Sequence, residues 1–189
     1  MCIPKICTFH DLTLFIMLLF CICDSYFRCR LIQKALDTLD KQDVANIVTS
    51  FKGKVWLLVH DHNGNHVIQR SITKINEFVA QATTVGLEQE EEGEEQNEVM
   101  ITSLVNALDI IIDEVTSSIK ELATHPYGCR VVQRLIEHCH DAQKDKVLDC
   151  IFDADLSSSL INHEYGNYVI QRFLTYGRLS GKCLLNFAS

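Results

Sequence analysis

The chain has 189 residues, 47% of them hydrophobic, with two prolines and eight glycines. This length and composition indicate one folded domain with the beginnings of a second, and they exclude collagen-like and low-complexity proteins. Acidic residues outnumber lysine and arginine 25 to 17, and the formal charge of -8 by itself argues against a nucleic-acid-binding protein, whose surface is usually basic.

The acidic residues are concentrated in one segment. Residues 88–98 hold seven carboxylates and no lysine or arginine, so removing these seven from the total of -8 leaves the rest of the chain at -1. A run of like charges is typical of a solvated, disordered loop, although this one could also compete with nucleic-acid phosphates for basic side chains. The net charge therefore describes this segment and not the remainder of the chain.

The first predicted element is an apolar N-terminal stretch over residues 1–23. Residues 15–23 are wholly apolar and follow Lys5, which is the order of features in a secretory signal peptide. No small-residue cleavage site follows, and the run is too short to span a bilayer. A signal, a buried helix and a non-native start such as misread coding sequence all remain open.

Beyond this stretch, a ten-residue pattern recurs along the chain. The clear copies are residues 61–70, 125–134 and 163–172, and a weaker copy at residues 26–34 has Arg28 where the others have glycine. Measured at the residue after the glycine, the copies are 36, 64 and 38 residues apart. Two of these spacings suit a repeat of two or three short helices, and the middle spacing contains an insertion.

Each copy has the apolar period of a helix, as in Val131, Val132, Leu135 and Ile136. Amphipathic stretches upstream of the copies predict further helices over residues 44–51, 108–115 and 146–152. Residues 55–59 could form a strand, but their counterparts at residues 119–123 and 156–161 favour a helix. The pattern therefore predicts an all-α solenoid. The glycines of the clear copies are expected to permit a tight entry into each helix, and His125 and His163 to serve as turn or packing residues.

The opposite face of each copy carries a small residue and a glutamine one helical turn apart. With this face, the copies resemble the Pumilio (PUF) repeats. The resemblance implies a right-handed α-solenoid in which each repeat faces one base of single-stranded RNA. The first and fifth residues of a five-residue run would contact the base edge, and the second would stack on the base. The implied base-edge residues are Cys29, Gln33, Asn65, Gln69, Cys129, Gln133, Asn167 and Gln171, and the implied stacking residues are Arg30, His66, Arg130 and Tyr168.

The family's pairing rule, in which Asn with Gln reads uracil and Cys with Gln reads adenine, implies the sequence 5′-UAUA-3′, with the RNA antiparallel to the protein. The resemblance also implies an eight-repeat domain, of which this chain would be a partial middle portion of three to four repeats within residues 24–177. The expected repeats are 24–39, 40–75, 104–139 and 140–177, with an acidic inserted loop at 76–103 and a truncated tail at 178–189.

By the same resemblance, the chain is expected to be a cytoplasmic, monomeric protein that binds mRNA 3′ untranslated regions and represses translation or promotes mRNA decay. Deadenylase or translational-repressor proteins would be its partners, and neither a membrane nor a cofactor is implied.

An armadillo or HEAT protein-binding scaffold is the alternative, but those repeats lack the recurring Asn/Cys-x3-Gln face. No acid–base constellation recurs that would indicate an enzyme. The nine cysteines are scattered, and the neighbours His138, Cys139 and His140 point in different directions on a helix, so no metal site is expected.

Overall fold

The computed structural model describes residues 26–85, 94–151 and 154–176. These ranges form helices joined by short turns and contain no strand, which confirms the predicted all-α class. The apolar stretch at 1–23 and the tail at 178–189 lie outside the described residues. The helices are α2 (Tyr26–Thr38), α3 (Lys41–Thr49), α4 (Val55–His60), α5 (Gly64–Val85), α6 (Glu94–Ser117), α7 (Ile119–Thr124), α8 (Gly128–His138), α9 (Asp141–Ile151), α10 (Ala154–Ile161) and α11 (Gly166–Tyr176).

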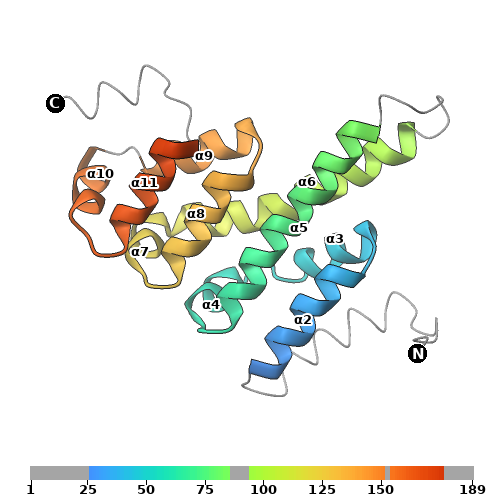
Figure 1. Ribbon diagram of the computed structural model, residues 1–189, viewed down its shortest axis with the longest axis horizontal. Coiled ribbons are helices and arrows are strands. Elements are labelled where there is room, and N and C mark those ends of the chain that lie inside the picture. The colour runs from blue at the N-terminus through green and yellow to red at the C-terminus, as the bar shows by residue number, and fades with distance from the viewer. Residues whose placement is uncertain (1–25, 86–93, 152–153, 177–189) are drawn as a thin grey trace.

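The helices are arranged in rows (Figure 1). The helices that contain the repeated pattern, α2, α5, α8 and α11, pack side by side in chain order, and we call them the motif helices. A second row, α3, α6 and α9, packs behind them, and the short helices α4, α7 and α10 each pack against the start of the next motif helix. Consecutive units are therefore neighbours in space, which is the arrangement of a solenoid.

The core lies between the two rows and is formed by the apolar stripes seen in the sequence. Val131, Val132, Leu135 and Ile136 of α8 are all completely buried, as the helical period predicts. Full burial of each such side chain stabilises the fold by about 1.5–3 kcal/mol. The core extends through every unit in the described ranges, from Leu36 of α2 to Phe173 of α11.

Glycines begin three of the motif helices because each helix starts in contact with the preceding short helix. A Cβ at Gly64 would lie 2.6 Å from the Leu58 carbonyl oxygen, and a Cβ at Gly128 would lie 2.5 Å from that of Leu122. Gly166 is crowded against α10 in the same way. The structural role predicted for these glycines is confirmed.

Side chains in the preceding turns fix where these helices begin. His125 Nδ1 accepts hydrogen bonds from the backbone N–H groups of Tyr127 at 3.2 Å and Gly128 at 3.1 Å. His163 makes the same two bonds before α11, at 3.1 and 3.3 Å, and Asp61 makes them through its carboxylate before α5, at 3.0 and 2.5 Å. His125 and His163 are therefore turn residues, as the sequence predicts.

The prediction of a disordered loop over residues 76–103 is wrong for most of that range. Helix α5 continues to Val85 and α6 begins at Glu94, so residues 76–85 and 94–103 are helical, and residues 86–93 lie outside the described residues. The segment is rich in carboxylates, but α5 also carries an apolar stripe, Ile75, Phe78 and Ala82, which is buried. The insertion thus lengthens two packed helices. Because α5 has 22 residues against 11 in α8, it projects roughly 16 Å further.

Candidate nucleic-acid interface

The motif helices bring the predicted base-edge and stacking residues onto one surface. Each five-residue run lies near the start of its helix, and the helices are neighbours, so equivalent side chains follow one another from α2 to α11. The second residue of every run, Arg30, His66, Arg130 and Tyr168, is exposed. Tyr168, for example, is 53% exposed although its side chain is large and aromatic.

In the two asparagine runs, the first and fifth residues are hydrogen-bonded to each other. Gln69 Nε2 donates to Asn65 Oδ1 at 2.8 Å, and Gln171 Nε2 donates to Asn167 Oδ1 at 3.0 Å. The amide group of Asn65 donates in turn to the backbone carbonyls of Asp61 at 2.9 Å and of the following residue at 2.7 Å. These bonds fix the orientation of each glutamine and leave its carbonyl oxygen and one N–H for another partner.

Asn65 itself is only 1% exposed, whereas the glutamine that it orients is half-buried. The structure therefore brings this predicted base-edge pair together but presents mainly Gln69 to the surface. Asn167, which lies on the last described motif helix, is half-buried. That the asparagines contact a base directly stays a prediction.

The cysteine runs are arranged differently. Gln133 Nε2 donates to the backbone carbonyl of Cys129 at 3.0 Å, because the thiol offers no strong acceptor in place of the asparagine oxygen. Cys129 is 3% exposed, and burial raises the pKa of its thiol, so it stays protonated at neutral pH. A glutamine beside an uncharged, polarizable thiol is a different hydrogen-bonding surface from a glutamine beside an asparagine.

Charge is distributed unequally between the two rows of helices. Arg30 and Arg130 flank His66 on the motif helices, and burial together with these arginines and His62 lowers the pKa of His66, so its ring is neutral at pH 7. In the second row, α9 exposes three carboxylates one turn apart, Asp141, Asp145 and Asp149, with two lysines between them. The row of predicted stacking residues on the motif helices, which we call the stacking row, is thus locally basic even though the chain is acidic. This charge favours an anionic ligand on the motif-helix surface.

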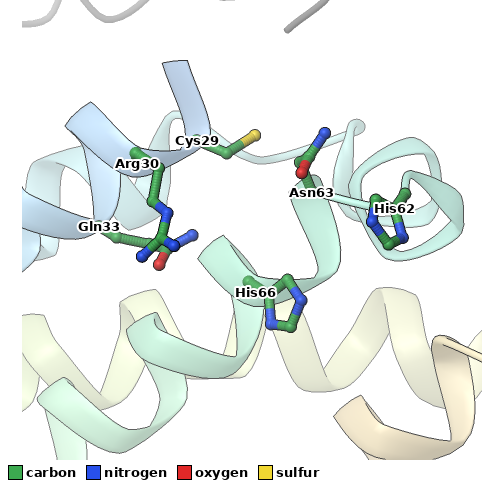
Figure 2. Close-up of a pocket in the computed structure, with 6 residues that line it drawn as sticks. All are labelled: Cys29, Arg30, Gln33, His62, Asn63 and His66. Atoms are coloured by element: carbon green, nitrogen blue, oxygen red, sulfur yellow. The ribbon is translucent and has the colours of Figure 1, made fainter. Parts of the chain in front are cut away.

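A cavity of about 220 Å³ lies between α2 and the start of α5 (Figure 2). Arg30 and Gln33 border it on one side, and His62, Asn63 and His66 border it on the other. Two predicted stacking residues therefore face one space from neighbouring helices. Cys29, Arg30, Gln33 and His66 were predicted from the repeat, whereas His62 and Asn63 were not.

The sequence also left the arginine that ends each clear copy without a role. Arg70 Nε donates to the Asp37 carboxylate of the preceding motif helix at 2.5 Å, and Arg172 donates to Glu137 of its preceding motif helix at 2.8 Å. These arginines join successive repeats. The signal that could have revealed them is an acidic residue at the same offset in two copies, since Asp37 lies three positions after Lys34 and Glu137 lies three positions after Arg134.

Cys139, which stands between two histidines in the sequence, belongs to the core. Cys139 is buried, and burial raises the pKa of its thiol to about 12. Within the described ranges, no group of histidine, cysteine and carboxylate side chains could hold a metal ion. Among the helices of those ranges, none has both the length and the apolar character needed to cross a membrane.

The model of the Pumilio-family RNA-binding repeat matches residues 29–49, 55–78, 118–152 and 158–180. The chain belongs to the Pumilio family. It is 29% identical over 146 residues to the Pumilio domain-containing protein C6G9.14 of Schizosaccharomyces pombe, covering 77% of this chain and 17% of that protein. It is 26% identical over 167 residues to Pumilio homolog 9 of Arabidopsis thaliana, covering 88% of this chain and 24% of that protein.

Among solved structures, the chain is similar to the Puf3 RNA-binding domain bound to the Cox17 RNA 3′ UTR recognition sequence site B. The two are 28% identical with a TM-score of 0.67, over 93% of this chain and 41% of that domain. The chain thus spans less than a quarter of these curated relatives and about two-fifths of that Pumilio domain. The fold is that of Pumilio RNA-binding repeats, which are a binding and not a catalytic family, in place of the armadillo or HEAT alternative.

Proposed function

We propose that the motif-helix surface binds single-stranded RNA and reads the sequence 5′-UAUA-3′ in mRNA 3′ untranslated regions. The observation that carries this proposal is the alignment of four base-reading runs on neighbouring helices, each with an exposed planar side chain at the same step. The basic character of the stacking row supports the choice of an anionic ligand.

The spacing of the helices suits intercalated bases. Packed helices lie roughly 8–10 Å apart, and a base held between two planar side chains needs about 7 Å, which is two van der Waals contacts of about 3.5 Å. The cavity between Arg30 and His66 would hold the fourth base of the RNA in this way. Each such stack contributes roughly 1–3 kcal/mol to binding.

The carboxamide arrangement supports the choice of bases. Uracil offers an N–H donor between two carbonyl acceptors, and the free oxygen and N–H of Gln69 or Gln171 provide one acceptor and one donor for that edge. Beside Cys129, the glutamine is oriented by a backbone carbonyl, and the small thiol leaves room for a larger purine.

The consequence for the bound mRNA is also part of the proposal. We expect repression of translation or promotion of decay through deadenylase or translational-repressor proteins, by a monomeric, cytoplasmic protein. Family membership supports this part, together with the bound 3′ UTR sequence of the similar Puf3 domain.

The proposal is tested by titrating the chain with fluorescently labelled RNA that contains UAUA. In parallel titrations, each base in turn is replaced by guanine. We expect each replacement to weaken binding by roughly 1–3 kcal/mol, or about 5- to 150-fold. Equal affinity for all of the RNAs would overturn base reading, and no binding to any of them would overturn RNA binding by this chain.

A further inference from the structure

The turn before α5 brings an additional polar side chain to the cavity between α2 and α5. Asn63 is half-buried and lines this cavity with Cys29 and Gln33. Its backbone N–H is held by Asp61 Oδ1 at 3.0 Å, which fixes the turn. Within the described part of the chain, the Asn63 carboxamide makes no hydrogen bond, so its donor and acceptor groups are available to a ligand. Figure 2 shows this side chain across the cavity from Arg30 and Gln33.

The equivalent position differs in the other clear copies, which have Tyr127 and Tyr165. Tyr127 is engaged in contacts between repeats, because its hydroxyl lies 3.1 Å from His62 Nδ1 and its ring packs against that of His62. The chain therefore contains two Cys–Gln sites with different neighbours. The site on α2 has Asn63 beside it, whereas the site on α8 has Tyr165 at the equivalent position, in the turn that precedes α11.

We propose that Asn63 is a further base-recognition residue, whose carboxamide contacts the edge of the adenine held by Cys29 and Gln33. This inference rests on the proposed RNA-binding function. A thiol is a weak donor and a weak acceptor, so Cys29 leaves part of the adenine edge unread. A carboxamide presents one donor group and one acceptor, which match the amino group and a neighbouring ring nitrogen of adenine.

The same geometry disfavours guanine. Guanine has two adjacent acceptors on its N7 and O6 edge, and the Asn63 oxygen would face one of them without a proton between the two atoms. The preference for adenine over guanine is therefore stronger at the fourth base of the RNA, which lies beside Asn63, than at the second base, which lies beside Tyr165. The two Cys–Gln sites of one chain provide a matched comparison, because their own base-edge and stacking residues are identical in type.

The experiment measures the affinity of the full chain for UAUA and for RNAs in which only the second or only the fourth base is guanine. We compare the unsubstituted chain with Asn63→Tyr, Asn63→Ala and Tyr165→Asn, and we verify folding by circular dichroism. Both Asn63 variants should lower the adenine-over-guanine preference at the fourth base by about 3- to 10-fold, the effect of one hydrogen bond, and leave the second base unchanged. Tyr165→Asn should raise the preference at the second base.

An unchanged preference at the fourth base in both Asn63 variants would overturn the inference while leaving base reading intact. An equal loss at both positions would also overturn it, since the effect would then not be local to one cavity. If the unsubstituted chain has no preference at either position, the proposed function fails, and this inference fails with it.

Discussion

Glu137 provides a test of how the repeats are held together. Its carboxylate accepts from Arg134 of its own helix at 2.7 Å and from Arg172 of the next motif helix at 2.8 Å, and its side chain is only 10% exposed. Glu137→Gln leaves both guanidinium groups without their anion. Removing one partner of a buried ion pair costs about 3–5 kcal/mol. Because the two arginine side chains are 44% and 37% exposed, water compensates part of this loss, and we expect about 2 kcal/mol.

The matched control is Asp37→Asn. Asp37 binds Arg70 from the equivalent place on α2, but the two side chains are 39% and 33% exposed. An exposed ion pair contributes only about 0–1 kcal/mol, and Arg70 keeps a second carboxylate, Glu77, at 3.2 Å, so this substitution should change stability little. Urea unfolding followed by circular dichroism measures both variants. Similar losses for the two, or a negligible loss for Glu137→Gln, would refute the view that burial decides the strength of these inter-repeat ion pairs.

Three further outcomes are expected. Gly128→Ala should destabilise the chain by roughly 1–3 kcal/mol in the same unfolding assay, because the new Cβ would lie 2.5 Å from the Leu122 carbonyl oxygen; an unchanged midpoint would contradict the close approach. Tyr168→Ala should weaken UAUA binding by roughly 1–3 kcal/mol without altering the unfolding midpoint, and equal affinity would show that this ring does not stack on a base. Burial lowers the pKa of His125, so just below about pH 6.5 the unfolded chain binds more protons than the folded chain. The free energy of unfolding should therefore fall as the pH falls from about 6.5 through the lowered pKa. His125→Asp, which introduces the residue type of Asp61, should weaken this dependence, whereas an identical pH profile would contradict it.

The repeat was the most informative feature of the sequence because it recurs with both a helical period and a fixed polar face. Period and spacing predicted the motif helices and their polar face, and the resemblance to Pumilio repeats implied that Arg30 and His66 lie on one surface, as they do around the cavity. The insertion was misjudged because its carboxylates outweighed three apolar residues at helical spacing, whose burial depends on the neighbouring α6. Asn63 could not be found from the pattern, since it departs from the tyrosine of the other copies and its position beside Cys29 depends on how α2 packs against α5.

The burial of Asn65 could not be predicted from the sequence either. Periodicity placed it on the polar face with Gln69, and that pairing is present at 2.8 Å. Its 1% exposure arises because the side chain turns inward to two backbone carbonyls of the preceding turn. The asparagine therefore orients the glutamine in this structure, and its own contact with a base is left to experiment.

The central claim, that side chains of the motif helices select individual bases, is tested most directly by changing one pair. Asn65→Ser with Gln69→Glu replaces two carboxamides by a hydroxyl and a carboxylate, which accepts hydrogen bonds and suits the N–H groups of guanine. Binding of this double variant is measured to RNAs that carry uracil or guanine as the third base, beside the unsubstituted chain. We predict that the preference changes from uracil to guanine at the third base and at no other. An unaltered preference for uracil, or a loss of binding to both RNAs in a variant that remains folded, would contradict base selection by this pair.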